Sequence, residues 1–229
     1  MKKLIYSWNE KKLRTFKSKI MDNVLARLDG KINYFYTKNQ QKVLEELTYH
    51  LDRNKLPTDD IIQILIIIEE AKFKNAQNAV KKYLNHKDEW VRKLSLRALT
   101  MGFRLKKYTK IAIQFLLTDP EIDCRCEGAL ALGVLYFNTK NKRIIKLLLS
   151  EFYKRKYKSS KNEYIRGSIY DAILDIYGLG RVAREYFEKY NEQELYLKEL
   201  IKNPSAVKKK YFENLKKLRK KQKFTKNEN

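Results

Sequence analysis

The sequence contains few of the residues that turn a chain sharply or bind a metal ion. Its 229 residues include only 7 glycines, 3 prolines, 2 cysteines and 2 histidines. So few turn-forming glycines and prolines argue against an all-β or α/β chain and favour helices joined by short loops. Cys124 and Cys126 point in different directions on a helix, and no second cysteine pair or histidine cluster completes a zinc site. We therefore expect reduced thiols, no metal and no cofactor.

Long apolar runs are also missing. The first 16 residues are basic but lack the apolar core of a signal peptide. The longest apolar run, Ile64 to Ile68, is far too short to span a bilayer. Hydrophobic residues still make up 43% of the chain, which is enough for a packed core. We expect a soluble cytoplasmic protein, or a nuclear one if the host has a nucleus, and we do not expect a membrane as its partner.

Acidic residues are scarce relative to basic ones. The chain has 51 Lys and Arg against 27 Asp and Glu, a formal net charge of +24. Residues 1–38 carry 10 basic and 3 acidic side chains, and residues 206–229 carry 10 and 2. Lysine-rich codon usage is a competing explanation, but it does not account for so unequal a balance. The charge predicts a polyanionic partner that is bound at the two ends of the chain.

Most of the chain has apolar side chains at helical spacing. The first two expected helices cover residues 4–28 and 39–52. Pro57 and Thr58 then end one helix and begin the next, in which the run from Ile61 to Glu70 is apolar on almost every side. A strand is the alternative for so isoleucine-rich a run. The cap before it and the Glu-Glu-Ala after it favour a helix buried on several sides.

A two-helix unit repeats between residues 73 and 178. Its first helices are expected at 73–84, 108–117 and 143–153, and each leads through a polar turn to a second helix. Such a period of two helices predicts a solenoid, in which stacked pairs bury the faces that no pair buries alone. The second helices share an arginine and, six residues later, an alanine. These residues are Arg92, Arg125 and Arg166, with Ala98, Ala131 and Ala172.

The turns agree with this period. Asp119 before Pro120 is expected to be an N-cap with proline in the first helical position. Ser160 and Glu163 are expected to form a capping box at the start of the second helix of the third pair.

The segment 118–135, TDPEIDCRCEGALALGVL, resembles a HEAT repeat of the bacterial type. That pattern has an Asp-Pro turn, a Val-Arg-like pair, small residues and then Leu-Gly. Asp119 and Arg125 are six residues apart, as are the Asp and Arg that form a ladder between repeats in that family. His86 and Ser160 replace the aspartate in the flanking units, so an incomplete ladder is expected. The resemblance, clearest over residues 73–178, implies an all-α, right-handed α-solenoid of antiparallel helix pairs, and says almost nothing about a partner.

The end of the chain has a different character. Pro204 and Ser205 stop one helix and begin another, in which Val207, Tyr211, Leu215 and Leu218 form one apolar stripe and lysines cover the other faces. We therefore divide the chain into a HEAT-like domain, residues 1–205, and a basic amphipathic helix with a frayed tail, residues 206–229.

Two groups of basic residues are the predicted nucleic-acid contacts. One begins on the outer side of the helix that contains Trp90, where its first three residues are expected close to one face and two lysines follow, but the next two repeats do not continue it. Lysine dominates the other, at the end of the chain, which predicts salt-sensitive contacts to the backbone with little sequence specificity. The first group is Lys93, Arg97, Arg104, Lys106 and Lys107, and the second is Lys208, Lys209, Lys210, Lys216, Lys217, Arg219, Lys220, Lys221 and Lys223.

Catalytic motifs are not recognised in the sequence. One enzyme alternative is the alkylpurine DNA glycosylases, which are HEAT-like, and the stretch Glu89 to Leu94 is similar to one of theirs. That family needs a catalytic Asp shortly after a Trp, and neither Trp8 nor Trp90 is followed by one. Trp90 is expected to pack between repeats instead.

We therefore predict a non-enzymatic binding protein whose partner is RNA, DNA or a ribonucleoprotein. The alternatives are a scaffold for an acidic protein and a glycosylase-like enzyme.

Overall fold

Every element in the described part of the chain is helical, which confirms the all-α prediction. The computed structural model describes residues 38–53, 56–154, 163–179, 190–210 and 213. The expected helix at 4–28, the residue Ser160 and most of the basic tail lie outside these residues. The helices are α2 (Lys38–Asp52), α3 (Thr58–Glu70), α4 (Gln77–Lys81), α5 (Glu89–Arg97), α6 (Thr109–Thr118), α7 (Ile122–Leu135), α8 (Lys142–Phe152), α9 (Glu163–Ile176) and α10 (Tyr190–Lys202).

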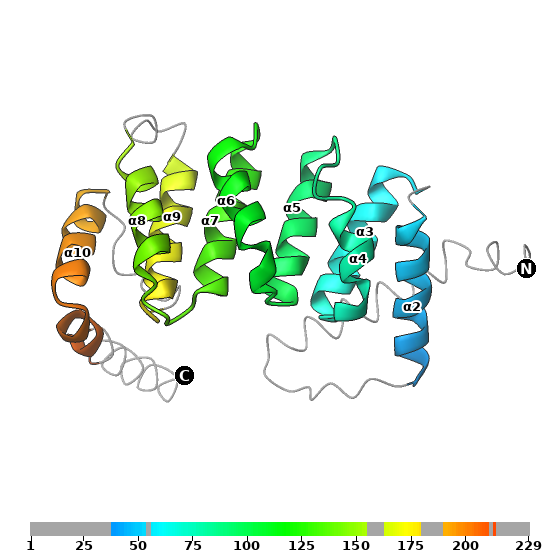
Figure 1. Cartoon of the computed structure of the whole chain (residues 1–229), viewed down its shortest axis with the longest axis horizontal. Coiled ribbons are helices and arrows are strands. Elements are labelled where there is room, and N and C mark those ends of the chain that lie inside the picture. The colour runs from blue at the N-terminus through cyan, green and yellow to red at the C-terminus, as the bar shows by residue number, and fades with distance from the viewer. Residues whose placement is uncertain (1–37, 54–55, 155–162, 180–189, 211–212, 214–229) are drawn as a thin grey trace, which may run out of the picture.

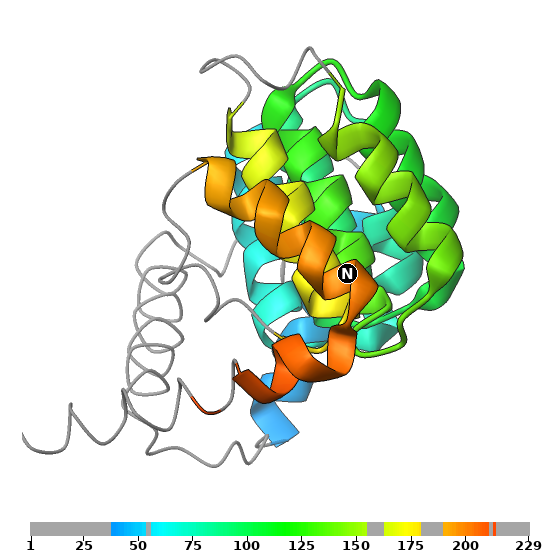
Figure 2. The same cartoon turned by 90° about the vertical axis from the view of Figure 1, so that its left-hand side faces the viewer.

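The helices stand side by side in a row that follows the order of the chain (Figure 1). Along the row α3 packs against α5, α5 against α7, and α7 against α9. A second layer is formed by the alternate helices, of which α6 packs on α7 and α8 on α9. Figure 2 looks along the row from the α10 end and shows the two layers. The turns between helices therefore gather at two opposite edges of the molecule.

The isoleucine-rich segment is a helix, not a strand. Pro57 precedes its first residue, and Asp59 and Asp60 stand in its first turn, where acidic side chains suit the positive end of the helix dipole. Five of its apolar side chains are buried and others pack partly against the core. The segment therefore satisfies its backbone internally while neighbouring helices cover most of its faces.

Two glycines set how closely α7 approaches its neighbours. A Cβ atom at Gly128 would lie 2.5 Å from the backbone nitrogen of Leu116 in α6. A Cβ atom at Gly133 would lie 2.8 Å from the Cα of Ala172 in α9. Both sides of α7 thus touch backbone directly. These small residues of the repeat pattern therefore allow the helices to pack closely.

Two details of the helix ends differ from the predictions. Helix α7 begins at Ile122 with Glu121 before it, so Asp119 is not the N-cap. The Asp119 carboxylate instead accepts from the backbone N–H of Glu121 and from a distant arginine. Helix α5 ends at Arg97 and continues as the π-helical turn η2 (Ala98–Gly102). Lys93, Arg97 and Arg104 were expected to share a helix face. Arg104 lies beyond the end of the helix, so this prediction is wrong.

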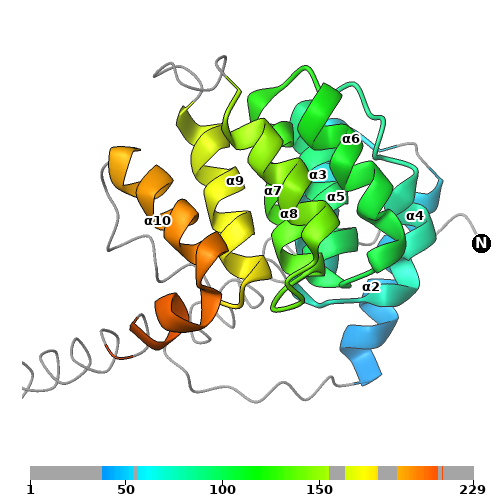
Figure 3. The same cartoon turned by 60° about the vertical axis from the view of Figure 1, so that its left-hand side comes forward.

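The row is closed by α10 and a short helical segment at residues 204–210 (Figure 3). Asn203 caps this segment, since its side-chain oxygen accepts from the backbone N–H of Ala206. Val207 is buried and belongs to the hydrophobic core. The predicted boundary at 205/206 falls inside this segment, whose first turns pack on the rest of the fold.

Candidate nucleic-acid interface

A buried ion pair joins consecutive repeats at one edge. The Arg92 guanidinium on α5 donates from Nε and Nη2 to the two carboxylate oxygens of Asp119, at 3.0 and 2.9 Å. Its Nη1 donates to the backbone carbonyls of His86 and Lys87. The arginine thereby links the turn before α5 to the turn before α7. The two side chains are only 11% and 6% exposed, so this contact is structural.

The other two repeat arginines make contacts of related kinds. Arg166, which is 1% exposed, donates to Glu194 of α10 at 2.7 Å and lies over the Phe152 ring. Burial lowers the pKa of Arg166, and the carboxylate opposes that shift. Arg125 donates from Nε to the backbone carbonyl of Leu116 in the preceding helix. The repeat arginines thus hold neighbouring elements together.

Two of the predicted nucleic-acid contacts already bind carboxylates. Lys93 lies 3.0 Å from Asp123, and Arg97 lies 2.7 Å from Glu69, so each pairs with a neighbouring helix or turn. Burial raises the pKa of Glu69, and the charge of Arg97 opposes that shift. A phosphate would have to displace a carboxylate to reach either cation. We therefore leave Lys93 and Arg97 out of the interface proposed below.

Trp90 was expected to pack between repeats, and this prediction is wrong. The side chain is 50% exposed, and the Lys93 ammonium lies 4.5 Å from its ring centre. The buried residues of α5 are Val91, Leu94, Ser95 and Leu96. The indole lies outside that buried set, with the Lys93 ammonium over its ring.

The neighbouring second helices, α7 and α9, contain buried acidic side chains besides their repeat arginines. Glu127 on α7 and Asp171 and Asp175 on α9 are buried to within a few per cent. The basic character of Lys93 and Arg97 is therefore not continued along this layer, as the sequence predicted. A continuous basic groove along the second helices is not formed by the described residues.

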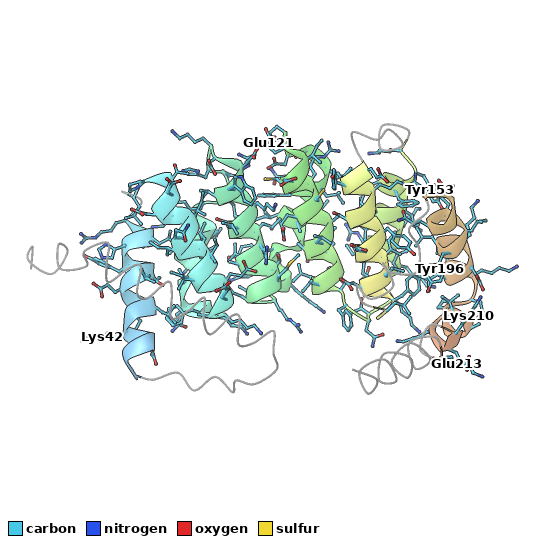
Figure 4. The ribbon with its side chains drawn as sticks, turned by 180° about the vertical axis from the view of Figure 1, so that it is seen from behind. Lys42, Glu121, Tyr153, Tyr196, Lys210 and Glu213 are labelled. Carbon is cyan, nitrogen blue, oxygen red and sulfur yellow. The ribbon has the colours of Figure 1, made fainter. Side chains whose placement is uncertain are left out.

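The turns after α3, η2 and α7 lie at one edge of the molecule (Figure 1), and within the described residues these turns contain basic side chains that form no ion pair. The segment 204–210 reaches the same edge, since Lys208 Nζ donates to the side chain of Asn138 at 3.2 Å. Figure 4 labels Lys42 and Lys210 along this edge and Glu121 at the opposite one. We call this surface the basic edge. It consists of Lys72, Lys74, Arg104, Lys106, Lys107, Lys140, Lys142, Arg143, Lys208, Lys209 and Lys210.

The cations of the basic edge are accessible. All are exposed except Lys208, which is partly buried. None of them takes part in the ion pairs found within the described ranges. Two lie over aromatic rings: Lys106 is 5.6 Å from the ring centre of Tyr136 and Lys107 is 5.4 Å from that of Tyr108. Acidic residues near this edge include Glu69, which is paired, Glu70 at the end of α3, the buried Asp175 at the end of α9, and Glu213 beyond residue 210.

Three of these cations occupy a strained backbone conformation. Lys72, Arg104 and Lys140 have φ angles of 51°, 56° and 54°. Such left-handed angles cost a residue other than glycine roughly 1–2 kcal/mol. Glycine would be the usual residue after the end of a helix. The basic side chains are thus kept at positions where they lower the stability of the fold.

Other cations of the edge stand where helix dipoles oppose them. Lys142 and Arg143 begin α8, and Lys106 and Lys107 form η3 (Lys106–Tyr108), which leads into α6. None of these first turns contains an acidic residue. The start of a helix has a partial positive charge, which disfavours a cation by roughly 0.3–1 kcal/mol. Local stability therefore does not explain this placement.

The opposite edge contains an acidic cluster. Asp88 and Glu121 directly precede α5 and α7, and they lie near Glu89 and Asp123 in the first turns of these helices. Burial of the Glu89 carboxylate, followed by the charge of Glu121, raises its pKa. An anion is therefore attracted to the basic edge more strongly than to this acidic cluster.

The sequence predicted part of this surface and missed part of it. Arg104, Lys106, Lys107 and Lys208 to Lys210 were predicted. Lys72, Lys74, Lys140, Lys142 and Arg143 were not, although each follows the end of a second helix at a similar position in the pattern. The remaining predicted contacts, Lys216, Lys217, Arg219, Lys220, Lys221 and Lys223, lie outside the described residues.

Burial of a cysteine gives a testable pH dependence. Burial, reinforced by the charge of Asp119, raises the pKa of Cys124 from 9.0 to about 12. Between these values only the unfolded state ionises, so the free energy of unfolding falls as the pH rises. Below pH 9 both states keep the proton and this contribution is fully present. We expect Cys124→Ala to make the fall between about pH 9 and 11 shallower in urea titrations. An unchanged slope would contradict the assignment.

Comparisons with known proteins identify no relative. No family model, curated protein or solved structure matches this chain. Within the described helices, none is long and apolar enough to cross a membrane. The same residues contain no group of three or more His, Cys, Asp or Glu side chains that could hold a metal ion.

Proposed function

We propose that this protein is a HEAT-like, right-handed α-solenoid that binds nucleic acid along its basic edge. The row of helix pairs and the arginine contacts between repeats support the solenoid. The arrangement of the basic edge supports the partner. Binding rather than catalysis is the activity we propose.

The observation that carries this proposal is the placement of the cations. Lysine and arginine occupy positions with left-handed backbone angles and positions at helix starts. The first cost stability through backbone strain, and the second through repulsion by the helix dipole. Departures from local rules of this kind concentrate at functional sites. A row of unpaired cations suits a chain of phosphates, because each phosphate carries one negative charge and releases bound counterions when it is neutralised.

The test compares wild-type full-length protein with the variant Arg104→Gly/Lys140→Gly. Glycine tolerates the positive φ of both positions, so this variant removes two charges without loss of stability. Binding to a labelled oligonucleotide is measured by fluorescence anisotropy between about 50 and 200 mM salt. If about six phosphates are engaged, wild-type affinity falls by roughly 10³-fold over this range. The variant binds about tenfold more weakly, and its salt dependence is shallower by about two phosphate contacts.

A matched control removes the same charge elsewhere. Lys81→Gln/Lys87→Gln changes two exposed lysines in α4 and in the turn before α5, near the acidic edge. We expect this control to bind within about twofold of wild type, because backbone contacts are local. Salt-independent binding, or equal losses in the two variants, would overturn the proposed interface. Co-purification of an acidic protein that resists nuclease would assign the edge to a protein partner instead.

A further inference from the structure

One aromatic ring stands exposed in the middle of the basic edge. Phe137, in the turn after α7, is 53% exposed. Phe103, Phe115 and Phe152 are buried, and Phe73 is partly buried against the core. Phe137 therefore differs from these phenylalanines in offering its ring to a partner.

The turn that carries Phe137 is held firmly. The backbone N–H groups of Asn138 and Lys140 donate to the carbonyls of Asp175 and Ile176 at the end of α9, at 3.0 and 3.1 Å. Thr139 closes the turn by donating to the carbonyl of Tyr136. A ring on such a turn loses little conformational freedom when it binds a partner.

Cations from two distant elements contact the residues that precede and follow Phe137 in the chain. Lys106 of η3 lies over the ring of Tyr136, which precedes Phe137. Lys208 donates to the side chain of Asn138, which follows it. Lys140 and Arg143, both exposed, stand a few residues further along the chain. An exposed apolar ring thus stands on a turn whose other residues contact or carry positive charges, and proteins combine aromatic rings with such charges to bind an unpaired strand.

We infer that Phe137 is a stacking platform for a base, and that the partner is therefore single-stranded nucleic acid. This inference rests on the proposed function. The flanking lysines hold the phosphates on either side of one nucleotide, while its base covers the phenyl ring. A duplex offers the same phosphates, but its bases are already stacked and paired, so the ring gains nothing from it.

The experiment measures wild type and Phe137→Leu against three ligands of one sequence: single-stranded RNA, single-stranded DNA and the DNA duplex. Leucine keeps the apolar character and removes the aromatic face. We expect wild type to prefer the single strands, and Phe137→Leu to bind them about tenfold more weakly while its duplex affinity stays within about twofold. Phe137→Tyr keeps a ring and retains the affinity of wild type. The RNA and DNA arms show whether the 2′-hydroxyl contributes.

Tyr164→Leu is the matched control, because Tyr164 is 79% exposed near the start of α9, away from the basic edge. This control is expected to bind every ligand as wild type does. Equal losses of Phe137→Leu on single strands and duplex, or no loss on either, would overturn the stacking platform. If Arg104→Gly/Lys140→Gly still weakens binding in that case, the basic edge stands and only the stacking fails. If wild type binds none of the three ligands, both proposals fail.

Discussion

Gly128→Ala lowers the free energy of unfolding by about 2 kcal/mol, the largest effect we expect from adding a single carbon atom. The new Cβ would lie 2.5 Å from the backbone nitrogen of Leu116 and 2.7 Å from the carbonyl oxygen of Ala112. Both obstacles are backbone atoms of α6, so the whole helix has to move. Urea denaturation followed by circular dichroism measures the loss.

The same substitution at Gly167 is the control. Gly167 is also inside a helix, α9, but a Cβ there meets nothing within 4 Å. Alanine in a helix interior is favoured over glycine by roughly 0.5–1 kcal/mol, so Gly167→Ala is expected to stabilise the protein. Opposite signs for the two variants follow from the packing of α7 on α6. A stable Gly128→Ala protein would show that these two helices are not in contact as described.

Arg92→Met is expected to cost about 3 kcal/mol, because it leaves the carboxylate of Asp119 buried without its cation. The substitution also removes the donor to the carbonyls of His86 and Lys87. Methionine keeps most of the side-chain volume, so the loss reports the polar contacts. The double variant Arg92→Met/Asp119→Leu recovers part of the stability, since no buried charge remains.

Lys82→Met provides the comparison for an exposed pair. Lys82 and Asp52 are 2.7 Å apart, as close as the buried pair, but their side chains are 49% and 53% exposed. Exposed pairs of this kind contribute roughly 0–1 kcal/mol. The expected contrast therefore depends on burial rather than on distance. Equal costs for Arg92→Met and Lys82→Met would contradict the structural role given to Arg92.

Local patterns predicted the helices well and their ends less well. Helices α2, α3, α6 and α8 lie within a few residues of their predicted positions, because the spacing of apolar side chains reports which face is buried. The end of α5 was missed, since the π-helical turn η2 changes the direction of the chain before Arg104. The start of α7 was misplaced because Asp119 binds Arg92, a contact that sequence spacing alone does not reveal.

The sequence by itself determined the helical class, the register of the repeat arginines and the excess of positive charge. These properties depend on residue type and on local spacing along a helix. Only the tertiary structure decided which cations are accessible. Lys93 and Arg97 are neutralised by carboxylates that are 30 and 28 residues away, whereas Lys106 and Lys208 contact Tyr136 and Asn138, the two chain neighbours of Phe137. Coulomb pairing and stacking depend on distance in space, and residues 70 positions apart become neighbours only when the helices pack.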